Sequence, residues 1–131
     1  YPSITNVNKA NKEICSEYNN KIKILPTMAF LGVGHDGHVA SIFYGNANIQ
    51  YSESPLLICK KKSEKFKRIS IDMEYLINIP KLIIIILDKN KHSILKCILD
   101  YKKQVSNLPI LHLLNKSKGD IYILYNKKII S

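Results

Sequence analysis

The run LIIIIL, from Leu82 to Leu87, constrains the fold more than any other stretch of this 131-residue chain. Six consecutive aliphatic residues leave no polar face, so the segment is expected to be a strand buried on both sides in the middle of a parallel sheet. It is far too short to cross a bilayer. Apolar residues then recur at helical spacing from Lys89 to about Tyr101. A buried strand followed by an amphipathic helix predicts an α/β fold.

The rest of the chain repeats this alternation of strands and helices. The sequence predicts a helix within residues 8–24, a brief helix over 38–45, and strands within residues 27–34, 55–60, 66–73 and 120–126. The stretch rich in Asn and Ser between residues 46 and 55 is expected to be a loop. No repeat or domain boundary interrupts the pattern. We therefore expect one α/β domain over residues 1–131, with a Rossmann-like, mostly parallel sheet flanked by helices.

The formal net charge of +10 invites comparison with proteins that bind nucleic acids. The basic residues are lysines scattered through every segment, and Arg68 is the only arginine. Base recognition depends on arginine forks and aromatic platforms, so we expect no specific nucleic-acid partner and only salt-sensitive affinity for polyanions. Runs such as CKKKSEKFKR are expected to be mostly solvated.

Three widely spaced cysteines, Cys15, Cys59 and Cys97, are odd in number and fit free thiols in a reducing compartment. No signal peptide or membrane segment is recognisable, which favours a cytoplasmic protein. The chain begins at Tyr1 without a methionine, so a trimmed N-terminus is expected.

The stretch LGVGHDGHVASIF, residues 31–43, carries the residues best suited to chemistry. Read literally, Gly32, Gly34 and Gly37 complete the G-x-G-x-x-G pattern of dinucleotide sites, but the expected following helix is too short and no acid ends the next strand. A glycine-rich turn that opens a helix suits a ligand-binding loop, in which His38 acts as a general base oriented by Asp36. A purely structural tight turn fits the pattern equally well.

The same stretch resembles the signature of the 6-phosphogluconolactonases, in which a strand precedes G-x-G-x-D-G-H-x-A-S-[LI]-F. Two later segments resemble the same family in the same order: KRISIDMEYLINIPKLIIIILDKNKHSIL and LPILHLLNKSKGDIYILYNKK. The resemblance implies a fold of the sugar-phosphate isomerase and deaminase type. It also implies hydrolysis of 6-phosphoglucono-δ-lactone in the oxidative pentose phosphate pathway, without a metal or cofactor.

The resemblance assigns roles to six residues. His38 falls on the family's general base and Asp36 on the acid that positions it. Backbone amides of Gly34 and Gly37 would meet the lactone carbonyl oxygen as it gains charge. Arg68 matches a phosphate-binding arginine, although it could also be the solvated end of the lysine-rich run, and Lys91 matches a second phosphate contact at a helix start.

The chain also departs from the family pattern. Asp88 stands where a glycine usually precedes the phosphate-binding lysine, and His35 fills a variable position beside the base. The family's upstream loop rich in glycine and serine has no counterpart, so the chain resembles the C-terminal half of such a domain, incomplete at its N-terminus. Some members are fused to glucose-6-phosphate dehydrogenase, and this chain could be part of such a protein. We expect the 131 residues alone to have little activity.

Two alternatives stay open. Glucosamine-6-phosphate deaminases share the fold and a similar loop, but continue it with A-F-N-E-P, whereas Ala40 to Phe43 read ASIF here. A binding or docking fragment without catalytic activity is the second alternative.

Overall fold

The computed structural model describes residues 11–22, 24–45, 49–53, 55–61, 63–100 and 107–126. The parallel sheet contains β1 (Ala29–Gly32), β5 (Lys81–Ile86) and β6 (Asp120–Tyr125), and the antiparallel sheet contains β2 (Ile49–Glu53), β3 (Leu56–Cys59) and β4 (Arg68–Ile71). The helices are α1 (Asn11–Lys21), α2 (Met73–Leu76), the 3₁₀ turn η2 (Lys89–Lys91), α3 (His92–Leu99) and α4 (Pro109–Lys116).

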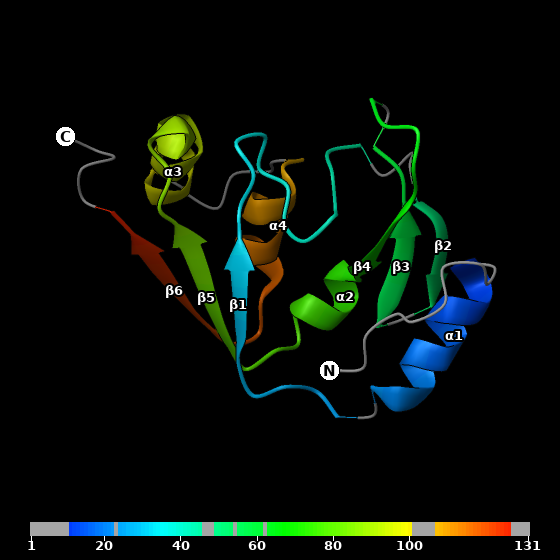
Figure 1. The fold of residues 1–131 in the computed structure, drawn as a ribbon. Coiled ribbons are helices and arrows are strands. Elements are labelled where there is room, and N and C mark those ends of the chain that lie inside the picture. The colour runs from blue at the N-terminus through cyan, green and yellow to red at the C-terminus, as the bar shows by residue number, and fades with distance from the viewer. Residues whose placement is uncertain are drawn as a thin grey trace.

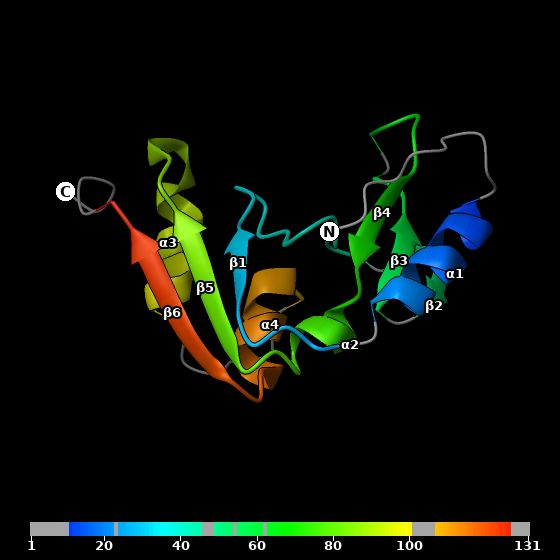
Figure 2. The same ribbon diagram turned by 60° about the horizontal axis from the view of Figure 1, so that its bottom comes forward.

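The expected central strand is β5, which pairs in parallel with β1 on one side and β6 on the other. Its side chains at Leu82, Ile84 and Ile86 are completely buried. They share one core with the apolar sides of α3 and α4, which cover the same face of the sheet (Figures 1 and 2). The prediction of a central parallel strand in an α/β fold is therefore confirmed. The expected burial of both its sides is wrong among the described residues, because Ile83 and Ile85 on the other side are only half-buried.

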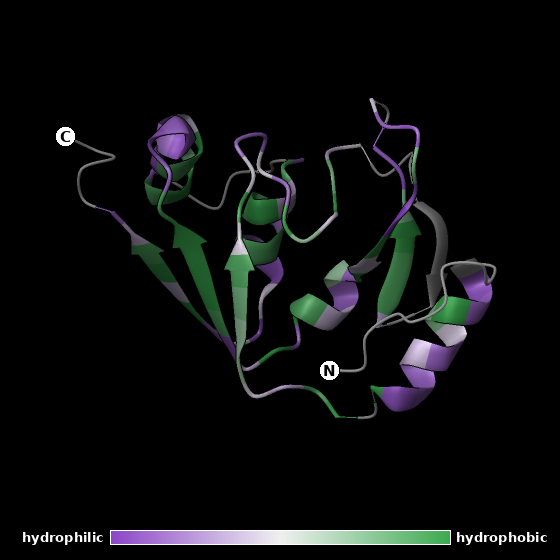
Figure 3. Ribbon diagram, in the orientation of Figure 1, coloured by the Kyte–Doolittle hydropathy of each residue, from purple (hydrophilic) through white to green (hydrophobic). Residues whose placement is uncertain are grey.

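The opposite face of this sheet is apolar but open among the described residues. Phe30, Tyr122 and Leu124 are 64%, 51% and 55% exposed, and the β5 residues between them are half-buried. In Figure 3, β1 and β5 are coloured mainly as hydrophobic, as expected for strands with apolar residues on both faces.

The sequence did not predict the antiparallel sheet β2–β3–β4. The stretch expected to be a loop contains β2, which pairs with β3, and the two predicted strands at 55–60 and 66–73 pair with each other as β3 and β4. Helix α1 packs on this sheet through Cys15, which contacts the buried residues Leu56 and Ile58. The predicted N-terminal helix is confirmed over the described residues from Asn11 onward.

The predicted brief helix over residues 38–45 is wrong. The segment forms tight turns in which Val39 makes isolated antiparallel bridges to Val33 and Ile42, and all three side chains are buried. Positive φ angles at Ala40 (51°) and Gly45 (75°) turn the chain away from a right-handed helix. The segment thus buries these aliphatic side chains as a loop that turns back toward Val33, and it does not form a helix.

The predicted helix after β5 consists of two consecutive elements, the 3₁₀ turn η2 and the α-helix α3. Its Ile94, Leu95 and Ile98 are buried as the helical stripe predicts, whereas Leu99 is 44% exposed. Tyr101, the expected end of the helix, lies outside the described residues. No sequence pattern predicted α4, whose Pro109 occupies the first turn, where a missing amide proton is tolerated.

None of the helices in the described ranges is both long enough and apolar enough to span a membrane. The three cysteines are free thiols, with Cys15 and Cys59 buried and Cys97 exposed.

Candidate active site

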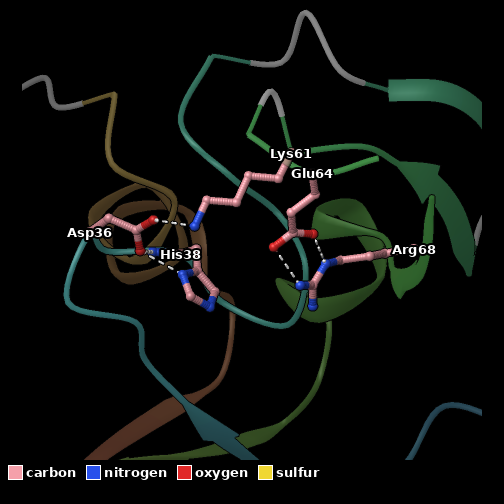
Figure 4. Close-up of polar contacts among 5 residues, drawn as sticks. All are labelled: Asp36, His38, Lys61, Glu64 and Arg68. Carbon is pink, nitrogen blue, oxygen red and sulfur yellow. Dashed lines mark hydrogen bonds and ion pairs between the residues drawn. The ribbon is translucent and has the colours of Figure 1, made fainter. Parts of the chain in front are cut away.

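The glycine-rich loop leaves the carboxyl end of β1 and folds back on itself. The amide of Gly34 donates to the carbonyl of His38 at 2.9 Å, and the amide of Gly37 donates to the carbonyl of Gly34 at 3.0 Å. These bonds close a compact turn that presents Asp36 and His38 beside each other (Figure 4). In this turn both glycine amides are engaged within the loop, which differs from their expected role as donors to a substrate oxygen.

The two glycines instead shape the loop. A Cβ atom at Gly34 would collide with the Nδ1 atom of His38 and the Oδ1 atom of Asp36, so only glycine allows the imidazole to lie against the backbone there. Gly37 has a φ of +78°, in the left-handed region that favours glycine. Glycine is therefore required at position 34 by the placement of His38 and at position 37 by the backbone conformation of the turn.

Asp36 and His38 form a tight pair, with 2.5 Å between Nδ1 of the imidazole and Oδ1 of the carboxylate. The Asp36 carboxylate also accepts from the His38 amide at 3.3 Å. Partial burial opposes ionisation of Asp36, but the hydrogen bonds and charge of His38 outweigh it and hold the pKa of this carboxyl below its ordinary value. An ionised carboxylate only accepts hydrogen bonds, so beside it the neutral form of the imidazole is the tautomer with its proton on Nδ1, and the Nε2 lone pair of that form is available.

The loop packs against α3 and α4, the two helices that cover the parallel sheet. The amide of Ile110, in the first turn of α4, donates to the carbonyl of Gly37 at 3.0 Å. Side chains of Ile94 in α3 and Leu108 before α4 lie next to the Cα atom of Gly37. The expected helix start at His38 is absent, and α4 supplies the neighbouring helix end.

Arg68 is the first residue of β4, opposite Cys59 in β3. Its guanidinium forms two parallel bonds to Glu64, with Nε to Oε2 at 2.8 Å and Nη2 to Oε1 at 2.7 Å. Hydrogen bonding to Glu64 raises the pKa of Arg68 above its ordinary value. The arginine is therefore held in an ordered ion pair, which distinguishes it from the freely solvated lysine run expected around it.

The ring of Phe43 lies beside both the His38 imidazole and the Arg68 guanidinium. The His38 ring centroid lies 4.9 Å from the Phe43 centroid, and the Lys61 Nζ and Arg68 Cζ atoms lie 5.2 Å and 5.7 Å from it. The Lys61 Nζ atom is also 3.9 Å from Asp36 Oδ2, so its side chain extends between the two ion pairs (Figure 4). One aromatic ring thus contacts three groups that can bind or activate an anionic ligand.

Phe43, Lys61 and Glu64 were not identified from the sequence. The available signals were an aromatic residue at the end of the glycine-rich motif and a single acid within a lysine-rich run, four residues before the only arginine.

Two polar contacts tie the loop to the antiparallel sheet. The Ser41 amide donates to the Oγ atom of Ser70 at 2.9 Å, and the Cys59 thiol donates to the Ser41 carbonyl at 2.9 Å. Burial raises the pKa of the Cys59 thiol, although the nearby charge of Arg68 opposes the shift. A protonated Cys59 can keep this bond, which fixes the loop relative to the strand that carries Arg68.

Lys91 lies at the end of η2, which follows the carboxyl end of β5. Parallel strands β1 and β5 are neighbours, so Lys91 and the loop after β1 lie at the same edge of the sheet. Asp88, the departure from the family pattern, accepts from the Asn90 amide at 2.9 Å and caps this turn. No direct contact between Lys91 and the group around Phe43 occurs within the described residues.

The described part of the chain holds no group of three or more His, Cys, Asp or Glu side chains suited to a metal ion. Around the Phe43 ring, the described residues bring together the His38 imidazole and the cationic side chains of Lys61 and Arg68.

Comparison with known proteins gives a consistent picture. Residues 2–123 match the family described as glucosamine-6-phosphate isomerases/6-phosphogluconolactonase. The 6-phosphogluconolactonase of Helicobacter pylori strain J99 is 30% identical over 103 residues, which are 78% of this chain and 45% of the relative. The chain therefore spans less than half of that relative.

Solved structures share the fold at lower identity. A 6-phosphogluconolactonase from Shewanella baltica has a TM-score of 0.72 and 16% identity, over 92% of this chain and 54% of the other. A monomeric glucosamine-6-phosphate deaminase has a TM-score of 0.67 and 16% identity, over 95% of this chain and 56% of the other. The expected α/β fold of the sugar-phosphate isomerase and deaminase type is confirmed.

Proposed function

Because this chain belongs to the family of glucosamine-6-phosphate isomerases and 6-phosphogluconolactonases, we propose that the polypeptide carrying it hydrolyses 6-phosphoglucono-δ-lactone to 6-phosphogluconate. The observation that carries the proposal is the Asp36–His38 pair. It orients the imidazole and leaves the Nε2 atom without a hydrogen bond to the described residues. The curated relative from Helicobacter pylori bears the name of the same activity.

In this reaction His38 is the general base. Its Nε2 atom takes a proton from a water molecule as the water oxygen attacks the lactone carbonyl carbon, and the carbonyl oxygen gains negative charge. The bond to the ring oxygen then breaks, and the imidazolium returns the proton to that oxygen. Asp36 stabilises the imidazolium between these steps, and the product is the open-chain acid.

Arg68 is the proposed phosphate ligand of the same substrate. Its planar guanidinium can bind two phosphate oxygens at once, and its contact with the same Phe43 ring as His38 supports this role. Lys91 is proposed as the second phosphate contact because it lies at the same sheet edge. Gly34 and Gly37 contribute by shaping the loop around the base.

The deaminase-like alternative finds no support at the loop, because Ala40 to Phe43 contain no acid that could assist ring opening. A docking fragment without activity is the alternative that the following experiment excludes or supports. A fused glucose-6-phosphate dehydrogenase domain and a cytoplasmic location accompany the proposal as predictions from the family resemblance.

The test measures lactone hydrolysis by the natural polypeptide, corrected for the spontaneous reaction. His38→Ala should lower kcat by at least about 10²-fold, since general-base catalysis contributes about 10²- to 10⁴-fold. Asp36→Asn should lower kcat by a similar factor, because an amide can donate to Nδ1 and favour the tautomer that has no base at Nε2.

His35→Ala is the matched control, because this exposed histidine adjoins the pair without bonding to it. It should retain most of the activity. Full turnover in His38→Ala would remove this residue from the mechanism, and a natural polypeptide that fails to accelerate hydrolysis would refute the proposed function.

A further inference from the structure

The Arg68 guanidinium already holds an anion. Its Nε and Nη2 atoms bind the two carboxylate oxygens of Glu64 side by side, at 2.8 Å and 2.7 Å (Figure 4). This edge of a guanidinium is also the one that binds two oxygens of a phosphate group. The Glu64 carboxylate thus has the position and geometry of a bound oxyanion.

The surroundings of Glu64 are those of an anion site. Hydrogen bonding from Arg68 is the main cause that holds the pKa of Glu64 below its ordinary value, and the charges of Arg68, Lys61 and His38 add to it. The lysine ammonium lies over the same Phe43 ring as the guanidinium. Glu64 is also the only acidic residue between Cys59 and Arg68. Its carboxylate therefore neutralises a locally positive site.

We propose that Glu64 is an internal competitor, whose carboxylate occupies the anion site of Arg68 and Lys61 until the phosphate group of a sugar-phosphate ligand displaces it. The identity of the ligand rests on the proposed function, whereas the competition concerns any phosphate anion. The Arg68–Glu64 pair is half-buried at the surface, and an ion pair between residues i and i+4 there is weak, so a dianion that also attracts Lys61 can replace it. The competition lowers phosphate affinity and keeps the unliganded site closed to weaker anions.

A purely structural role for Glu64 predicts the opposite sign. If the carboxylate only positioned the guanidinium, its neutralisation would release Arg68 and weaken phosphate binding. If the carboxylate competes with phosphate, its neutralisation frees the Arg68 guanidinium and strengthens phosphate binding. The measured direction of the change distinguishes the two roles.

The experiment is a calorimetric titration of inorganic phosphate into the natural polypeptide and its variants. Glu64→Gln should bind phosphate about 2- to 5-fold more tightly, the range expected for removal of a weak ion pair near the surface. Glu74→Gln removes the same charge from an exposed position on α2 and should leave the affinity unchanged. Arg68→Ala should abolish the gain, so Arg68→Ala and Arg68→Ala/Glu64→Gln should bind phosphate equally.

Weaker or unchanged phosphate binding by Glu64→Gln overturns the proposal. An equal gain in phosphate affinity in Glu74→Gln also overturns it, and so does a lack of phosphate binding by both the natural polypeptide and Glu64→Gln. The titration measures binding and not turnover, so failure of this proposal can be distinguished from failure of the proposed lactonase function. A protein that fails to hydrolyse the lactone can still show the gain in phosphate affinity, and an active lactonase can lack it.

Discussion

The Asp36 carboxylate ionises more readily than an ordinary aspartate, which makes the stability of the site depend on pH. Its pKa in the folded chain lies below the unfolded value. The resulting stabilisation is fully present above the unfolded pKa, near pH 4, and is lost as the pH falls through the lower folded value. Acidification below about pH 4 should therefore destabilise the natural protein more than Asp36→Asn.

Urea unfolding at pH 6 and at a series of values below pH 4 measures this difference. The gap in unfolding free energy between the two proteins should narrow as the pH falls. A gap that stays constant across the series would show that the pair contributes no pH-dependent stability.

Arg68 is distinguished from the surrounding lysines by its geometry, and substitution tests whether that geometry is used. Arg68→Lys keeps the charge but loses the paired donors that hold Glu64 at 2.7 Å and 2.8 Å. We expect KM for the lactone to rise by about 3- to 30-fold with a smaller change in kcat, in line with the loss of one charged hydrogen bond. Lys67→Arg, the reverse exchange at the exposed neighbouring position, should leave KM unchanged. Equal kinetic constants for Arg68→Lys and the natural protein would assign Arg68 to the solvated run.

At the level of elements, the turn from residue 38 to residue 45 explains where sequence reasoning succeeds and fails. The aliphatic spacing of Val39 and Ile42 is helical, yet both side chains are buried by a loop with isolated bridges. Local spacing cannot reveal such tertiary pairing. The same limit applies to β2, whose polar sequence forms a strand only because β3 lies beside it.

The strongest local patterns were predictive. The aliphatic run of β5 and the stripe of α3 identified the α/β core because burial alone specifies them. Asp36, His38 and Arg68 were accessible through their motif, and the first two lie close because they are two residues apart. The contacts of Phe43 with Lys61 and Arg68 join a loop to a sheet across some 18 to 25 positions, which no short pattern encodes.

Two positive φ angles in the loop after β1, at Gly37 and Ala40, lead us to expect stability effects of opposite sign on substitution. Ala40 has a φ of 51°, in a region that costs a residue with a side chain about 1–2 kcal/mol, whereas glycine adopts it freely. Ala40→Gly should stabilise the chain by up to about 1 kcal/mol, because the greater freedom of unfolded glycine offsets part of the relief. Gly37→Ala should destabilise it by about 1–2 kcal/mol, since its φ of +78° is then strained.

Chemical denaturation of both variants beside the natural protein measures these shifts. Destabilisation by Ala40→Gly would indicate that the turn adopts another backbone conformation in solution.

At the scale of the whole molecule, the main feature is the open face of the parallel sheet, whose apolar side chains no described residue covers from solvent. Phe30 in β1 and Tyr122 and Leu124 in β6 lie on either side of the central strand β5, and each is more than half exposed. Beside Phe30, an apolar cavity of about 560 Å³ lies between α1 and the two sheets. Exposed apolar surface of this extent is typical of a region that another segment or molecule covers.

The chain spans only about half the length of its relatives, which agrees with a sheet face that further residues cover. The chain spans 45% of the Helicobacter pylori relative and 54% of the Shewanella baltica structure. Because the motifs resemble the C-terminal half of such a domain, we propose that upstream residues supply the missing cover and that the family's upstream loop rich in glycine and serine supplies further substrate contacts.

These considerations predict that the 131 residues alone have little lactonase activity and associate through the open face, although they carry His38, Arg68 and Lys91. Orientation of a small substrate requires several simultaneous contacts, and lost positioning lowers rates by orders of magnitude even with an intact base. The 131-residue chain and a polypeptide extended upstream through the Gly/Ser-rich loop should be compared by specific activity and by sedimentation. Leu124→Gln in the short chain should reduce its association without restoring activity, since it removes apolar surface and adds no substrate contact. Equal specific activity of the short and extended chains would show that residues 1–131 already hold every group that the reaction requires.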